Sequence, residues 1–235
     1  MAVDHALLEL GVPALRFYKW KPACLSFGRN QPARGLYDAD VARELNIDIV
    51  RRPTGGAAVL HAAELTYAVV APVGMFGWPR ESYLAINRAL VSGMRRLGVD
   101  AVMSNGVKRA PFGTVHPCFA EPAAGEVVVN GLKLIGSAQR VENRVLLQHG
   151  SILLDGTQDA VSRIARVPFS LQGQSTTVRE VLGDVPSDRE MVDALAAGFE
   201  EECGLAYDPD QPNTVSERAR ELLTVYSSEE WTWRR

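Results

Sequence analysis

The sequence predicts a mixed α+β protein in which mostly antiparallel β-sheets are flanked by helices. Short aromatic and β-branched runs bounded by Pro and Gly recur through the first seventy positions or so, which is typical of strands. Further strand patterns surround an Asn-Gly pair near the middle of the chain, and the last third has helical periodicity. Strands that come first and helices that follow indicate the α+β class rather than strict β–α alternation.

Five strands are expected before the first long helix. Pro53, Gly55 and Gly56 mark the turn between the third and the fourth of them. The expected strands are 15–20, 23–27, 47–52, 57–61 and 65–70. A helix follows from about Ser82 to Leu97, because apolar residues recur at spacings of three and four and Gly98 ends the pattern.

A hairpin is expected near the middle of the chain. The segment from Ser104 to Gly125 has little apolar pattern, and loops of that length in compact domains are usually functional or disordered. After it, "EVVV-NG-LKLIG" predicts a β-hairpin, since Asn130 and Gly131 accept the positive φ of a type I′ turn. Residues 145–154, "VLLQHGSILL", predict another buried strand.

The C-terminal third is expected to be helical and to pack on the sheet core from about residue 187. Ser187 and Glu190 form a capping-box pattern that opens a helix ending near Gly204. Thr214 and Glu217 suggest a second box. No segment has the composition of a linker, so residues 1–235 are interpreted as one domain.

Composition excludes several classes of function. The chain has 235 residues, 46% of them hydrophobic, and a net charge of −3, which gives no general attraction to nucleic acid or to an anionic membrane. It has neither the charge pattern of a signal peptide nor an apolar run of membrane-spanning length, so a reduced, cytoplasmic compartment is expected. Cys24 and Cys203 are interpreted as small core residues. His116 and Cys118 lack the further ligands that a metal site needs, so we expect no metal.

The remaining cysteine, Cys118, lies in an irregular Pro/Gly/Ala-rich loop, and Lys133 follows on the returning strand of the hairpin. A thiol becomes a good nucleophile when a base takes its proton. Apolar neighbours of Lys133 would disfavour its charged form, so that its amine could accept a proton from the thiol. The alternative is an inert loop cysteine and a solvated lysine.

Other polar residues are ambiguous by themselves. "RRPTGG" is a glycine turn that could approach a ligand carbonyl or phosphate, or be an ordinary turn. His61 and His149 lie beside apolar strand residues and could be core histidines. "IGSAQ" could line a narrow apolar slot or allow close helix packing.

Taken together, the motifs resemble the lipoate–protein ligase A and octanoyltransferase superfamily, whose catalytic domain is also that of biotin ligases (the BPL/LPL type). Five segments carry the likeness over nearly the whole chain: "RFYKWKPACLSFGRNQ", "RRPTGGAAVLHAAELTYAVV", "CFAEP", "GEVVVNGLKLIGSAQR" and "LLQHGSILL". Within it, Cys118-Phe119 followed by the hairpin lysine is similar to the LipM-type octanoyltransferase branch. Ala57, Ala62 and Ala63, and the segment 123–126, depart from that branch's usual pattern.

The resemblance implies an acyltransferase of lipoate biosynthesis that uses no cofactor. Cys118 would take an octanoyl group from octanoyl-acyl carrier protein as a thioester, and Lys133 would serve as its proton partner. The acceptor would be a lysine of a lipoyl-carrier protein, such as glycine cleavage H protein or the lipoyl domain of a 2-oxoacid dehydrogenase E2. The acyl channel and reacting carbonyl would be lined by Arg51, Arg52, Thr54, Gly55, Gly56, His61, Gly136, Ser137, Ala138 and His149.

Three alternatives stay open. One is an ATP-dependent lipoate–protein ligase, in which Lys133 would contact the acyl-adenylate phosphate and Cys118 would be dispensable. Another is an octanoyl amidotransferase between carrier proteins, which would use the same cysteine. The third is a non-catalytic binding subunit.

Overall fold

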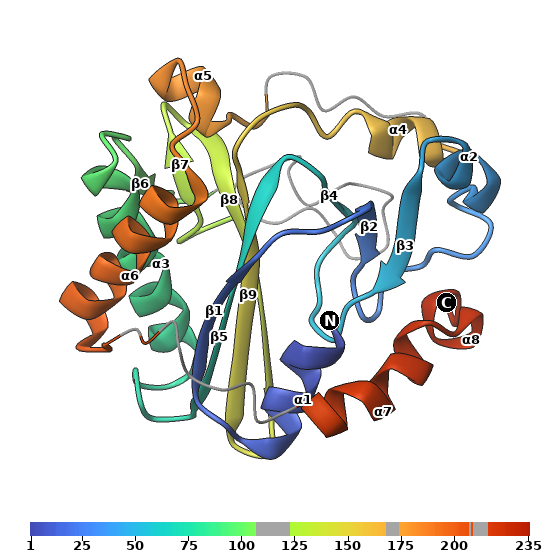
Figure 1. Cartoon of the computed structure of the whole chain (residues 1–235), viewed down its shortest axis with the longest axis horizontal. Coiled ribbons are helices and arrows are strands. Elements are labelled where there is room, and N and C mark those ends of the chain that lie inside the picture. The colour runs from blue at the N-terminus through green and yellow to red at the C-terminus, as the bar shows by residue number, and fades with distance from the viewer. Residues whose placement is uncertain (107–122, 168–173, 207, 209–215) are drawn as a thin grey trace.

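Two β-sheets and the helices around them make up the described part of the chain (Figure 1). The computed structural model describes residues 1–106, 123–167, 174–206, 208 and 216–235. The larger sheet has six strands in the order β1-β5-β9-β8-β7-β6, and every neighbouring pair in it is antiparallel. Its strands are β1 (Ala14–Tyr18), β5 (Glu64–Pro72), β6 (Val102–Met103), β7 (Val127–Val129), β8 (Leu132–Glu142) and β9 (Val145–Leu153). The predicted α+β class is confirmed.

The smaller sheet has the order β3-β2-β4 and consists of β2 (Ala23–Phe27), β3 (Ile47–Arg51) and β4 (Val59–His61). Strands β2 and β3 are parallel, because helix α2 (Ala39–Glu44) returns the chain between them. Strand β4 then pairs antiparallel with β2. The turn between β3 and β4 contains "RPTGG", so this sequence joins the two outer strands of the small sheet.

Helices cover both faces of the large sheet, which explains why β5 is buried along almost its entire length. Alternate β5 residues Leu65, Tyr67 and Val69 pack with α3 (Pro79–Arg96) and α6 (Asp188–Cys203). The intervening Ala68 and Val70 pack on the other face with α1 (Ala2–Leu10) and α7 (Ser216–Tyr226). The remaining helices are α4 (Ala160–Ile164), α5 (Val178–Leu182) and α8 (Glu229–Thr232).

The strongest local sequence signals are confirmed. Asn130 and Gly131 have φ values of 50° and 79°, as the predicted hairpin turn requires. Ser187 and Glu190 form the predicted capping box at the start of α6, and Gly204 ends that helix in the left-handed conformation. Thr214, of the second expected box, and most of the expected loop after Ser104 lie outside the described residues.

Several short elements were missed by the sequence reasoning, namely α1, α2, α4, α5, α8 and β6. Within the ranges that the structure describes, no helix is long and apolar enough to cross a membrane.

Candidate active site

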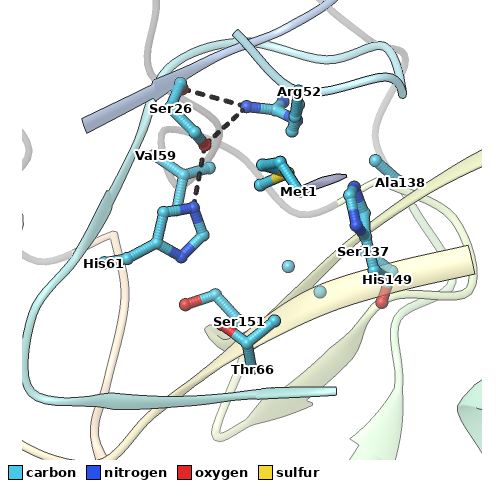
Figure 2. A pocket seen from close by; sticks show the side chains of 12 residues that line it. Met1, Ser26, Arg52, Val59, His61, Thr66, Ser137, Ala138, His149 and Ser151 are labelled. Carbon is cyan, nitrogen blue, oxygen red and sulfur yellow. Dashed lines mark hydrogen bonds between the residues drawn. The ribbon is translucent and has the colours of Figure 1, made fainter. Parts of the chain in front are cut away.

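A pocket lies between the large and the small sheet (Figure 2). The empty space in and above it is about 340 Å³, counting space open to solvent. One wall comes from the small sheet and the following turn, and the other from β5, β8 and β9. The lining residues are Met1, Ser26, Arg52, Val59, His61, Thr66, Gly136, Ser137, Ala138, His149, Gly150 and Ser151.

His61 is fixed by hydrogen bonds on both ring nitrogens. Nε2 lies 2.8 Å from the Ser26 hydroxyl oxygen, and Nδ1 lies 3.2 Å from Glu64 Oε1. Trp20 stacks on the ring with a centroid distance of 4.7 Å and an interplanar angle of 24°. Glu64 is buried and also accepts hydrogen bonds from Thr66 and Ser151, both of which line the pocket. The imidazole therefore has one orientation in the pocket wall.

His149 belongs to a second chain of the same kind. Its Nδ1 lies 3.2 Å from Asp4 Oδ2, and its Nε2 lies 2.6 Å from the Thr54 hydroxyl oxygen. Burial lowers the pKa of His149 and outweighs the opposing effect of Asp4. Although burial alone would raise the pKa of Asp4, the hydrogen bond from His149, then the charge of the Met1 amino group, and to a smaller extent that of Arg16 bring it below its usual value. We assign a neutral imidazole that donates to Asp4 and accepts from Thr54.

Arg52 connects the pocket to the glycine turn. Its NH1 donates to the carbonyl and hydroxyl oxygens of Ser26 at 3.0 and 3.1 Å, and its NH2 donates to Gly55 O at 2.8 Å and Ala57 O at 2.7 Å. The turn also packs closely on the end of β2, since a Cβ added at Gly28 would come within 1.9 Å of the Gly56 carbonyl oxygen. The predicted turn "RRPTGG" is thus held in place from the inside.

Lys133 is buried, with 1% exposure, so it is not a solvated strand residue. Its Nζ lies 2.8 Å from Glu126 Oε2 and 2.9 Å from Oε1, and Glu126 also accepts a hydrogen bond from the Ala123 backbone amide at 2.7 Å. Val127 pairs with Ile135 while Val128 pairs with Lys133, so one step along β7 matches two along β8. Such a bulge re-aims the neighbouring side chains. The bulge and the ion pair together fix the lysine. The expected wholly apolar surroundings of its amine are thus wrong, because a buried carboxylate faces the nitrogen.

The structure brings together about half of the residues expected at the site. Six of them line the pocket, and Thr54 reaches it through His149. Arg51 lies outside the pocket, fully buried, and donates to backbone carbonyls of residues 28, 31 and 232. Gly55 and Gly56 are also absent from the pocket lining, although the Gly55 carbonyl oxygen accepts a hydrogen bond from Arg52. Lys133 is outside the pocket lining, and Cys118 lies outside the described residues.

Sequence reasoning missed the carboxylates that organise this site, Asp4, Glu64 and Glu126. All three are buried, at 0%, 1% and 3% exposure. The sequence signal that could have found them is an acidic residue next to or within an otherwise apolar element. Such a residue is expected to be buried, and a buried carboxylate needs a hydrogen-bond or charged partner. Of the side-chain nitrogen and oxygen atoms buried in the described part of the pocket wall, none lacks a hydrogen-bond partner. The buried polar side chains of the wall are therefore already bonded to other protein atoms, which suits an apolar ligand.

Comparison with known proteins identifies the same family over most of the chain. The model of the lipoyl protein ligase A/B catalytic domain matches residues 1–200. The octanoyltransferase LipM of Kyrpidia tusciae is 38% identical, with the alignment covering 100% of this chain and 94% of that protein. The octanoyltransferase LipM of Symbiobacterium thermophilum is 39% identical, with 100% and 93% covered.

The fold is similar to that of solved structures described as lipoate protein ligases. Protein Ta0514 from T. acidophilum, solved with bound lipoic acid, has a TM-score of 0.81 at 25% identity and covers 100% of this chain and 92% of its own. A lipoate-protein ligase A bound with ATP has a TM-score of 0.79 at 28% identity, with 99% and 92% covered.

Proposed function

The chain belongs to the lipoyl protein ligase A/B catalytic domain family, and from that membership we propose that it is an octanoyltransferase of protein lipoylation. The observation that carries the proposal is full-length similarity to LipM octanoyltransferases at 38–39% identity, together with the pocket that the predicted family residues line. The acceptor we propose is a lysine on a lipoyl-carrier domain. A related T. acidophilum ligase has been studied structurally together with its E2 lipoyl domain.

The proposed reaction has two acyl transfers. The Cys118 thiolate attacks the octanoyl thioester of acyl carrier protein, and the carrier's thiol leaves as the acyl-enzyme thioester forms. The lysine of the lipoyl-carrier domain then attacks the Cys118 thioester with its neutral amine, which gives an amide and returns the thiol of Cys118. Thioester exchange is nearly thermoneutral and amide formation from a thioester is downhill, so the sequence of steps needs no ATP.

Lys133 is the residue proposed to exchange the proton of the cysteine thiol. Two observations support this role. The side chain is withdrawn from solvent, and Glu126 holds its nitrogen in a fixed place. The carboxylate also stabilises the ammonium that Lys133 becomes once the thiol proton has moved to it. Glu126 also accepts a hydrogen bond from Ala123, at the point where the described chain resumes after residue 122. The same carboxylate thus links the lysine to the end of the segment that contains Cys118.

The pocket is proposed to hold the octanoyl chain. Its buried polar side chains are already hydrogen-bonded to other protein atoms, which leaves a wall suited to methylene groups. Each buried CH₂ contributes about 0.8 kcal/mol, so a chain that fills the pocket binds better than a shorter one.

Intact-mass spectrometry tests the proposal. Incubation with octanoyl-acyl carrier protein is expected to add the mass of one octanoyl group to the wild-type enzyme. The Cys118→Ser variant is expected to show no such gain. Cys24→Ser is the matched control, because Cys24 is buried and should not accept the group. Wild-type protein that gains no octanoyl mass but acylates a carrier would contradict the thioester route. Undiminished acylation of Lys133→Ala near neutral pH would refute the proton role.

The second candidate is ATP-dependent lipoate ligation, which the likeness to an ATP-bound lipoate-protein ligase A favours. Full transfer by Cys118→Ser with lipoate and ATP would select it. Donor preference separates the remaining enzymatic alternative: an amidotransferase would take octanoyl groups from glycine cleavage H protein rather than from acyl carrier protein.

A further inference from the structure

Three arginines from distant parts of the sequence meet beside the pocket. Arg29 follows β2, Arg140 lies on β8, and Arg234 follows α8. Arg234 NH2 donates to the Arg29 carbonyl oxygen at 2.5 Å, and both guanidinium groups lie over the ring of Trp231, at 3.9 Å for Arg234 and 6.0 Å for Arg29. We call Arg29, Arg140 and Arg234 the arginine cluster.

Positive charge in the arginine cluster is only partly balanced. Arg140 pairs with Glu142, whereas no carboxylate of the described residues pairs with Arg29 or Arg234. Arg234 Nε is buried and has no hydrogen-bond partner among the residues that the structure describes. Burial, and then the charge of Arg29, lower the pKa of both Arg140 and Arg234. A chain with a net charge of −3 therefore concentrates like charges here, which costs stability and favours an anionic partner.

The arginine cluster adjoins the outer side of the glycine turn. The Arg29 backbone amide donates to Thr54 O at 2.7 Å, and Arg140 NH1 reaches Pro53 O at 3.4 Å. On the inner side of the same turn, the Thr54 hydroxyl contacts His149 of the pocket wall. A molecule bound at the arginine cluster is thus one turn of chain away from the pocket.

We propose that the arginine cluster is the docking surface for the acyl-donating carrier protein and binds anionic groups of that donor; this rests on the octanoyl transfer proposed above. The donor fits better than the acceptor for a chemical reason. An acceptor brings a lysine ammonium, which the cluster repels, whereas a donor brings an acyl group on an arm that carries a phosphodiester. Guanidinium groups bind carboxylates and phosphates by paired hydrogen bonds.

The test compares two donors that differ in the carrier body. Acyl-enzyme formation is measured with octanoylated acyl carrier protein and with octanoyl-pantetheine, an uncharged small thioester. Arg29→Glu is expected to lower kcat/KM for the carrier donor at least tenfold at low ionic strength, and added salt should narrow the difference. The small thioester should be used within twofold of wild type. Arg140→Gln is a second, milder variant that should act in the same direction.

The matched control is Arg189→Glu, which makes the same charge change on α6, on the side of the large sheet away from α8 (Figure 1). Arg189 is highly exposed, and the control should leave both donors unaffected. Equal losses with both donors, or no loss with either, would overturn the proposal. Loss confined to the later transfer to the lipoyl-carrier lysine would assign the surface to the acceptor instead.

Failure of the proposed function is distinguishable from failure of this inference. If wild-type protein forms no acyl-enzyme with either donor, the octanoyl transfer is wrong. Fluorescence anisotropy of labelled acyl carrier protein then still tests docking without any turnover. Wild type should bind at least tenfold more tightly than Arg29→Glu, and equal binding would overturn the inference.

Discussion

Replacing Glu126 tests how strongly its buried ion pair with Lys133 stabilises the folded protein. In Glu126→Gln the amide cannot neutralise the ammonium, which is 1% exposed and 2.8 Å from the original carboxylate. Removing one partner of a buried pair usually costs about 3–5 kcal/mol, because the other charge is left without compensation. Glu201→Gln, in an exposed pair with Arg96 at 2.9 Å, is the matched control and should cost less than about 1 kcal/mol.

Urea denaturation followed by far-UV circular dichroism measures both variants. With a slope of about 2–3 kcal/mol per molar urea, the Glu126→Gln midpoint should fall by about 1–2.5 M. A double variant with Lys133→Met should recover much of this loss, since apolar groups can replace a buried pair without large cost. A midpoint shift no larger than that of Glu201→Gln would refute the reasoning.

Three further predictions concern the surroundings of the pocket. Gly28→Ala should destabilise by about 1–3 kcal/mol because its Cβ would meet the Gly56 carbonyl at 1.9 Å, while Gly55→Ala, with open space around it, should be nearly neutral in the same urea titration. The free energy of unfolding should fall from pH 7 to pH 5, because His149 is protonated near the ordinary pKa of 6.5 in the unfolded chain while burial keeps its pKa lower in the folded protein. His149→Gln should show a smaller fall over the same pH range, and a fall equal to that of wild type would contradict the assignment. Burial raises the pKa of Cys24 to about 12, so iodoacetamide at pH 8 should label it only after unfolding, and labelling of the native thiol would show that the strand opens.

Features that depend on neighbouring residues could be predicted from the sequence. The Asn130-Gly131 turn and the capping box of Ser187 and Glu190 are set by local backbone requirements, and the structure has both. The carboxylate partners of the site are different. Asp4 meets His149 across 145 positions, and only the pairing of distant elements brings them together. No local pattern contains that information.

Short helices were missed for a related reason. Helix α2 has six residues, too few for apolar periodicity to be visible, and its Asp38 cap is its clearest signal. Arg51 shows the opposite limit. The sequence placed it in a turn that contacts ligand, whereas the structure buries it among backbone carbonyls of residues 28, 31 and 232. Whether a cation faces a ligand or its own backbone is decided by the fold.

Strand β8 carries Lys133 near one end and Arg140 near the other, on a ribbon held by β7 and β9. Seven residues of extended chain span about 23 Å. A strand with neighbours on both sides cannot contract, so it fixes the distance between the lysine proposed to exchange the thiol proton and the arginine cluster. A donor whose acyl-bearing arm is shorter than this distance could dock at the arginine cluster and still not bring its acyl group to the lysine.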